Sequence, residues 1–484
     1  MQNSNIKNVI LIDSPGEWVE TVLELKNVNI SLVVTCEFEK IRERFGKNIE
    51  NIFPRDIGNK EFNSIYFSDY NLSYEELEKY RSTQLKVEHY LHRYLSNDGL
   101  IQYYYHMALA FWLEFFSKNS IDMVFLGTVE HGAFWDSILI DIAKEKGISV
   151  FIISYSAGVN IAKGEDIDIK HIVYYNNLSF VNLGKINKEN KEIVEVRKYL
   201  ELLSRAHNKN SISKIVFKNP LKCYINTKIK TLFEVFLYLL YTPMMKYNKI
   251  ARKNNFMHLS KREIFKQSLH TDSLRKVYKN ISKKIDLKTE YIYYPLHLDP
   301  EASIMARSIL TSQIFIIQWL SSVLPNGWKL IVKEHPHQFF LYERERFYLK
   351  NIDGYREFAF YFQIKNLPNV EFADINISSS ELIQNSQAIA SICGSSLIEG
   401  VAYKKPILAF GKSLSFVELL EDTFVIQSRD DLVQAIEEIK SGFKPKYNDL
   451  RVVIDEYTFL KNSLTFDNKS FYASIFKHLL ESKK

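Results

Sequence analysis

The sequence predicts an α/β protein with two domains, each built around a parallel sheet. Three observations support this class. The chain has 484 residues, which is too long for a single hydrophobic core. Its second half contains a strand–helix–strand unit from Tyr291 to His337. Its first half alternates short β-branched runs with helical patterns, and such alternation is typical of parallel sheets.

Composition sets the general class of the protein. Hydrophobic residues make up 46% of the chain and charged residues 25%, as in ordinary globular proteins. The cysteines Cys36, Cys223 and Cys393 are odd in number and far apart, so we expect a reduced, cytoplasmic protein without disulfides or a zinc site. We expect no signal peptide, and the apolar stretches Tyr103–Phe116 and Val235–Tyr241 fall short of the roughly 20 residues that span a bilayer.

Four apolar runs in the first half predict strands: Asn8–Ile12, Ile30–Thr35, Ile121–Leu126 and Ile148–Ser154. The third run leads into the loop Gly127–Gly132, ahead of a helix expected at Phe134–Lys146. This loop places the carboxylate of Glu130 beside the imidazole of His131, and either could serve as a general base within reach of a substrate hydroxyl. Alternatively, Glu130 caps the helix and His131 is a surface or packing residue.

Positive charge is concentrated in the middle of the chain. Between Ser211 and Arg262 eleven Lys and Arg residues face one acid, Glu234, around the apolar run Leu232–Met245, although the whole chain carries only +6. Such a segment suits peripheral contact with an anionic membrane face, or with a polyanionic acceptor, through residues 214–262. It could equally be an interdomain connection with solvated lysines. No nucleic-acid recognition motif accompanies the charge.

The unit in the second half predicts a strand at Tyr291–Pro295, a helix at Ser303–Val323 and a strand at Trp328–Val332. Its two loops carry polar residues, namely His297, Asp299 and Glu301 in the first and Lys333, Glu334, His335 and Pro336 in the second. Both loops follow the carboxyl ends of parallel strands. We therefore expect them to meet at one edge of the sheet, where ligands bind in open α/β folds.

A later strand, Ala388–Ile392, leads into Gly394, Ser395 and Ser396 and then into a helix. Small residues at the positive end of a helix let backbone N–H groups and hydroxyls approach a phosphate. Glu399 follows Ser395 by about one turn and could reach a ribose hydroxyl. Alternatively, Ser395 only caps the helix.

These motifs together resemble those of bacterial capsule polysaccharide synthesis proteins, a group that includes Kdo transferases. The resemblance rests on Pro295–Ser303, on Lys333–Pro336, and on Gly394-Ser395-Ser396 with Glu399 and Gly400. The His-Pro and Ser-Ser elements are also similar to those of bacterial sialyltransferases. The resemblance covers about Tyr291–Gly411. The first half matches loosely, because Glu130-His131-Gly132 is similar to an acid-acid-Gly motif with His in its second position.

The resemblance implies a GT-B fold, in which two Rossmann-like domains face a cleft. Residues 1–205 would form the acceptor domain and residues 286–455 the nucleotide-sugar-binding domain. Residues 206–285 would form a basic, largely helical connection, and residues 456–484 a helical tail that could return to the first domain.

The resemblance also implies roles for individual residues. His335 would contact the donor nucleotide and phosphate, Ser395 and Ser396 would hold the phosphate, and Glu130 would be the general base, with His131 as the alternate. Further donor-binding residues would be His297, Asp299, Glu301, Lys333, Glu334, Pro336, Gly394 and Glu399. No cofactor or metal ion is expected, because a helix amino end with His335 and Lys333 could stabilise the departing phosphate.

We therefore expect a cytoplasmic glycosyltransferase of capsular or lipopolysaccharide synthesis. It would transfer Kdo or another nonulosonic acid from a CMP-sugar to a glycan or lipid-linked glycan. The alternatives are a UDP-sugar transferase, a sugar-nucleotide epimerase of the same architecture, and a non-catalytic subunit of a polysaccharide assembly machine.

Overall fold

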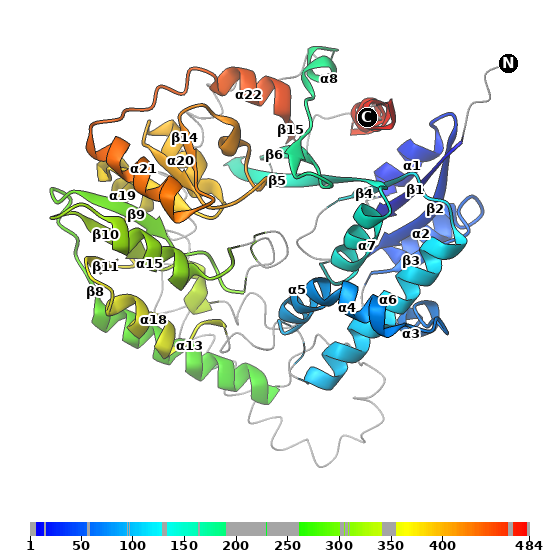
Figure 1. Ribbon diagram of the computed structural model, residues 1–484, viewed down its shortest axis with the longest axis horizontal. Helices are drawn as coiled ribbons and strands as arrows, with labels where there is room; N and C mark the ends of the chain where they lie inside the picture. Colours follow the sequence, from blue (N-terminus) through cyan, green and yellow to red (C-terminus); the bar gives the residue numbers. More distant parts are fainter. Residues whose placement is uncertain are drawn as a thin grey trace.

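The computed structural model describes residues 6–13, 16–55, 59–93, 95, 97–127, 133–162, 165–189, 229, 261–300, 304, 308, 310–340, 355–462 and 468–481. They form two lobes, each built on its own sheet (Figure 1). The first lobe comprises the described residues of 6–189 together with 458–481, and the second comprises those of 261–457. The expected α/β class with two parallel-sheet domains is confirmed.

The sheet of the first lobe has the order β15-β6-β5-β4-β1-β2-β3, and β7 pairs with β6. Its strands are β1 (Lys7–Ile12), β2 (Val28–Thr35), β3 (Ile52–Pro54), β4 (Met123–Leu126), β5 (Ser149–Ala162), β6 (Glu165–Tyr174), β7 (Ser179–Phe180) and β15 (Thr458–Asn462). Strands β1 to β5 pair in parallel, whereas β6 runs antiparallel to β5 and to β15. The parallel part places the loops after β1, β2 and β4 at one edge.

The helices of the first lobe cover both faces of this sheet (Figure 1). They are α1 (Gly16–Leu23), α2 (Phe38–Phe45), α3 (Phe62–Ile65), α4 (Tyr74–Lys79), α5 (Arg81–Leu91), α6 (Asp98–Lys118), α7 (Ala133–Glu145), α8 (Gly184–Glu189) and α23 (Asn468–Glu481). The apolar stretch Tyr103–Phe116 lies within α6, where Trp112 is fully buried. Across the described ranges, no helix is both long enough and apolar enough to cross a membrane.

The carboxyl-terminal segment packs against the start of the chain. Strand β15 pairs with β6, and Trp18 of α1 contacts Tyr472 and Phe476 of α23 at ring-centroid distances of 5.5 and 5.4 Å. Burial of these large aromatic side chains attaches the end of the chain to the first lobe.

The sheet of the second lobe is parallel throughout its described strands and has the order β14-β13-β12-β9-β10-β11-β8. The strands are β8 (Ser282–Lys283), β9 (Tyr291–Pro295), β10 (Lys329–Lys333), β11 (Val370–Ala373), β12 (Ala388–Ser391), β13 (Ile407–Ala409) and β14 (Thr423–Val425). The chain builds outward from β9 through β10 to β11 and then crosses to β12 on the other side of β9. Loops after β9, β10 and β12 therefore meet where the strand order reverses, which is the usual ligand position in such sheets.

The helices of the second lobe are α13 (Lys261–Ile281), α15 (Gln313–Val323), η1 (Pro336–Phe340), α18 (Phe358–Lys365), α19 (Ser379–Asn385), α20 (Ser395–Ala402), η2 (Phe416–Leu419), α21 (Arg429–Lys440) and α22 (Leu450–Tyr457). The prediction of one continuous helix over Ser303–Val323 is wrong, because residue 308 and residues 310–312 are not helical and α15 begins at Gln313. Ser312 has extended backbone and its side chain accepts a hydrogen bond from the N–H of Phe315, so it caps the helix there.

The two lobes are in direct contact. The hydroxyl of Tyr355 donates to the carbonyl oxygen of His89 in α5 at 2.8 Å, and the hydroxyl of Ser413 donates to the carbonyl oxygen of Leu178. Most of the basic stretch 214–262 lies outside the described residues. The chain that follows it, α13 and β8, joins the second lobe, since β8 pairs with β11.

Candidate active site

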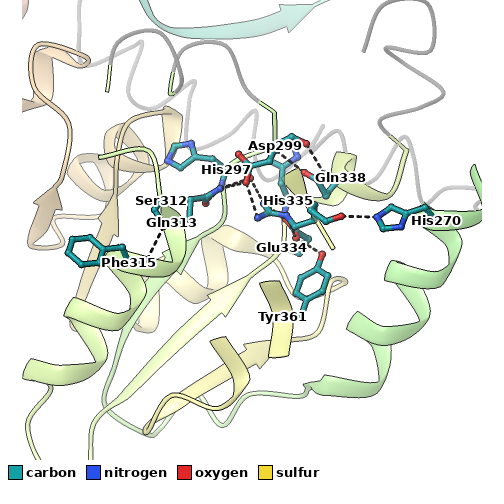
Figure 2. A network of polar contacts seen from close by, with 11 residues as sticks. His270, His297, Asp299, Ser312, Gln313, Phe315, Glu334, His335, Gln338 and Tyr361 are labelled. Carbon is teal, nitrogen blue, oxygen red and sulfur yellow. Dashed lines mark hydrogen bonds and ion pairs between the residues drawn. The ribbon is translucent and has the colours of Figure 1, made fainter. Parts of the chain in front are cut away.

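Three loops converge at the carboxyl edge of the second sheet, following β9, β10 and β12. The ring Nε2 of His297, after β9, lies 3.0 Å from Oγ of Ser391 at the end of β12. A Cβ atom added to Gly394 would lie 3.7 Å from Cε1 of His297. The predicted meeting of His297 and Asp299 with Glu334 and His335 is confirmed, because all of them join one network of polar contacts (Figure 2).

Hydrogen bonding fixes the proton of His297. The hydroxyl of Ser391 donates its single hydrogen to the carbonyl oxygen of Cys393 at 2.8 Å. Its contact with His297 must therefore have the ring nitrogen as donor, so Nε2 of His297 carries the proton. The hydrogen bond between Nε2 and Ser391 therefore orients the ring of His297 beside the Gly-Ser-Ser loop.

Two glutamines hold the loop after β9. Oε1 of Gln313 accepts from the N–H of His297 at 2.8 Å, and its Nε2 donates to Oδ2 of Asp299 at 2.7 Å. Gln338 accepts from the N–H of Asp299 at 2.9 Å and donates to its carbonyl oxygen at 2.8 Å (Figure 2). Sequence analysis identified neither glutamine, because their partners, three backbone groups and the carboxylate of Asp299, lie in a loop distant in the sequence.

Arg356 joins the loop after β9 to the loop after β10. Its side chain is 0% exposed, and Nη2 donates to the carbonyl oxygen of His297 at 2.8 Å. Nη1 lies 2.9 Å from Oδ2 of Asp299, and Nε lies 3.1 Å from Oε2 of Glu334. The guanidinium also lies over the ring of Phe360, 3.9 Å from its centroid. Sequence reasoning missed Arg356 as well, since it belongs to none of the motifs.

Glu334 is fully occupied within the protein. It is 1% exposed, its Oε1 accepts from the N–H of His335 at 2.7 Å, and its Oε2 accepts from the hydroxyl of Tyr361 at 2.6 Å. Burial raises the pKa of this carboxyl, and the charge of Arg356 opposes that shift. Its carboxylate is directed toward His335, Tyr361 and Arg356, and the expected role of Glu334 in donor binding stays a prediction.

Lys333 is a buried cation on the other face of the sheet from Glu334. It is 4% exposed, and its Nζ donates to Oγ of Ser379 at 3.2 Å. Burial lowers the pKa of Lys333 to about 8, while the charges of Glu399 and Asp374 oppose the shift. Glu399 is itself buried in α20, and its charge acts on Lys333, so Lys333 brings a positive charge near the helix that follows the Gly-Ser-Ser loop.

The start of α20 has the backbone expected of an anion site. Gly394 is its N-cap residue with φ at +103°, a left-handed conformation that side chains rarely adopt. No side chain caps the helix, and Ser395 lies inside its first turn. The alternative that Ser395 is merely the cap is therefore wrong. Ser395 and Ser396 are half-buried, and Gly394 precedes them as the N-cap residue of the helix.

In the first lobe the loop with the candidate bases Glu130 and His131 lies outside the described residues, as does Glu301. At the adjoining strand ends, the N–H of Gly127 donates to the carbonyl oxygen of Ile12 at 2.9 Å. Next to it, Asp13 forms an ion pair with Arg55. Within the described ranges, no group of three or more His, Cys, Asp and Glu side chains is arranged to hold a metal ion.

No protein-family model matches the chain, and no curated protein matches it. Among solved structures, the chain is similar to the UDP-GlcNAc 2-epimerase of Methanocaldococcus jannaschii, with 11% identity, a TM-score of 0.23, and coverage of 98% of this chain and 99% of that one. It is similar to the beta Kdo 2,7 transferase KpsC of Thermosulfurimonas dismutans, with 9% identity, a TM-score of 0.29, and coverage of 89% and 90%.

A third similar structure is Alr3699/HepE of Anabaena, solved with UDP and glucose, with 10% identity, a TM-score of 0.25, and coverage of 99% and 100%. The two-lobed α/β class rests on the two parallel sheets themselves.

Proposed function

We propose that this protein is a GT-B glycosyltransferase of surface polysaccharide synthesis, which transfers a sugar from a nucleotide donor to a glycan acceptor. One observation carries the proposal. The ring of His297 lies within contact distance of both Ser391 and the Gly394 position, at the edge where the strand order of the second sheet reverses. This arrangement brings the loops after β9 and β12 and the amino end of α20 to one point.

The chemistry of that point suits the phosphate of a nucleotide-sugar. The first turn of α20 begins without a side-chain cap, so its backbone N–H groups and the hydroxyls of Ser395 and Ser396 favour an anion. Lys333 adds a positive charge close to this helix. As the bond to the sugar breaks, negative charge grows on the departing phosphate, and these groups would stabilise it without a metal ion. His335 would contact the donor from the adjacent loop.

The donor and acceptor are assigned by the motif resemblance. We propose CMP-linked Kdo or another nonulosonic acid as the donor sugar, and a capsular or lipopolysaccharide glycan as the acceptor, held by the first lobe. Glu130, with His131 as the alternate, would remove the proton from the acceptor hydroxyl. A cytoplasmic location, with residues 214–262 against the membrane face, would bring the enzyme to lipid-linked acceptors.

The test is a titration of the protein with CMP, UDP, GDP and ADP, followed by thermal unfolding. A ligand at 100 times its dissociation constant should stabilise the native state by about 2.7 kcal/mol. CMP should bind, and Ser395→Ala and His335→Ala should weaken it. Ser73→Ala is the matched control, because Ser73 also lies at the start of a helix but caps α4 in the first lobe.

Product analysis then separates the remaining readings. Incubation with CMP-Kdo and a glycan acceptor should extend the glycan. Binding of UDP in place of CMP would favour a UDP-sugar transferase, and conversion of a UDP-sugar without an acceptor would show an epimerase. If no nucleotide binds the native protein, the transferase proposal fails and a non-catalytic assembly subunit becomes the better reading.

A further inference from the structure

Two consecutive residues, Tyr355 and Arg356, contact different lobes. Tyr355 contacts the first lobe, whereas Arg356 contacts loops of the second. The hydroxyl of Tyr355 donates to the carbonyl oxygen of His89 at 2.8 Å, and its ring lies nearly parallel to that of His89, with an interplanar angle of 17° and centroids 5.9 Å apart. Arg356, the next residue, is buried at the candidate donor site.

The contacts of Arg356 involve both loops that carry the candidate donor-binding histidines. On one side it binds the carbonyl oxygen of His297 and the carboxylate of Asp299. On the other it binds Glu334, whose carboxylate accepts the N–H of His335. Its own carbonyl oxygen lies 2.8 Å from Nε2 of His270 in α13. A guanidinium presents its donors in a rigid plane, so a displacement of residue 356 must alter the contacts to both loops together.

We propose that Arg356 is a positioning residue of the donor site, and that Tyr355 links it to the first lobe. This inference rests on the proposed function. Adjacent Cα atoms are about 3.8 Å apart across a rigid peptide unit, so a shift of Tyr355 relative to the second lobe passes directly to Arg356. Contact between the lobes then sets the geometry of the loops with His297 and His335. Binding a donor sugar and closing the acceptor lobe onto it become coupled events.

Three backbone amides report on this coupling without any ligand. The N–H groups of His297, Asp299 and His335 donate, in that order, to the side chains of Gln313, Gln338 and Glu334. These hydrogen bonds lie within the loops after β9 and β10 that Arg356 joins. If Arg356 holds both loops through the lobe contact, loosening that contact must increase the hydrogen exchange of these amides.

The experiment compares Tyr355→Phe with Ser413→Ala by hydrogen exchange of the full chain. Each variant removes one hydroxyl that donates to a carbonyl oxygen across the lobes, but Ser413 is not adjacent to Arg356. Tyr355→Phe should raise the exchange of the three amides about threefold to tenfold, the effect of one lost hydrogen bond. Ser413→Ala should leave them unchanged. Equal exchange in the two variants, or no change in Tyr355→Phe, would overturn the coupling.

A second arm measures nucleotide affinity in the same proteins. Tyr355→Phe should weaken binding of the nucleotide that binds best by about threefold to tenfold, with Ser413→Ala close to the native protein. Arg356→Lys keeps the charge but loses the planar fork, so it should raise exchange at all three amides even where thermal unfolding shows a folded protein. If no nucleotide binds the native protein, the proposed function fails, while the exchange measurements still decide the positioning role of Arg356.

Discussion

Replacement of Arg356 with Met removes the cation of the buried network while keeping a side chain of similar length. Glu334 is 1% exposed, and its carboxylate would lose the guanidinium that lies 3.1 Å away. Breaking a buried pair by removing one partner costs about 3–5 kcal/mol, because the other charge is left uncompensated. The side chain of Asp299 is 18% exposed and can regain water, so we expect a loss of about 3–4 kcal/mol in the free energy of unfolding.

The loss should depend on pH in a defined direction. Burial already raises the pKa of Glu334 from its ordinary value of 4.5, and Arg356 opposes this shift. Without Arg356 the pKa rises further. Between pH 4.5 and that raised value, the folded state of the Arg356→Met variant binds more protons than its unfolded state. The free energy of unfolding of the variant therefore increases as the pH falls. The deficit relative to the native protein should therefore shrink on acidification.

The assay is urea unfolding followed by circular dichroism, near pH 7.5 and near pH 5.5. Arg451→Met is the matched control, because Arg451 is 87% exposed and its nitrogen lies 3.7 Å from Asp455 one turn away, so the loss should stay below about 0.5 kcal/mol. The double variant Arg356→Met with Glu334→Gln should recover part of the stability at neutral pH. A loss under about 1 kcal/mol, or a deficit equal at both pH values, would refute the reasoning.

Three further outcomes are expected. Burial lowers the pKa of Lys333 to about 8, so raising the pH through that value removes its charge. Nucleotide affinity should therefore fall around this pH in the native protein but not in Lys333→Met. An unchanged affinity in the native protein would argue against a role for this charge. Gly394→Ala and Gly327→Ala both place alanine at positive φ and should each cost about 1–3 kcal/mol, but only Gly394→Ala should also weaken nucleotide binding, as measured by calorimetry. Phe476→Ala removes a ring packed on Trp18 and should destabilise the protein by about 3–5 kcal/mol in thermal or urea unfolding, whereas a loss below about 1 kcal/mol would mean that α23 contributes little to the first lobe.

Much of the strand framework could be read from the sequence. The run Tyr291–Pro295 forms β9 over the same residues, because aromatic and β-branched side chains ended by proline favour a short buried strand. The loops after β9 and β10 were also placed correctly at one edge, since parallel strands direct their carboxyl ends the same way. The start of α15 was predicted too early, because apolar spacing continues before Gln313 while the cap at Ser312 decides where the helix begins.

The sequence by itself determined the central strands β1, β2, β4, β9, β10 and β12 to within a few residues, and which of the loops after them carry polar side chains, because those features follow from local patterns of two and 3.6 residues. Only the tertiary structure decided what holds the loops in place. Arg356 lies 59 residues after His297 and 22 after Glu334, yet it binds both. The partners of a buried charge depend on how distant segments pack together, so they cannot be predicted from local sequence periodicity. Arg356, Gln313 and Gln338, which hold these loops, could therefore be identified only from the tertiary structure.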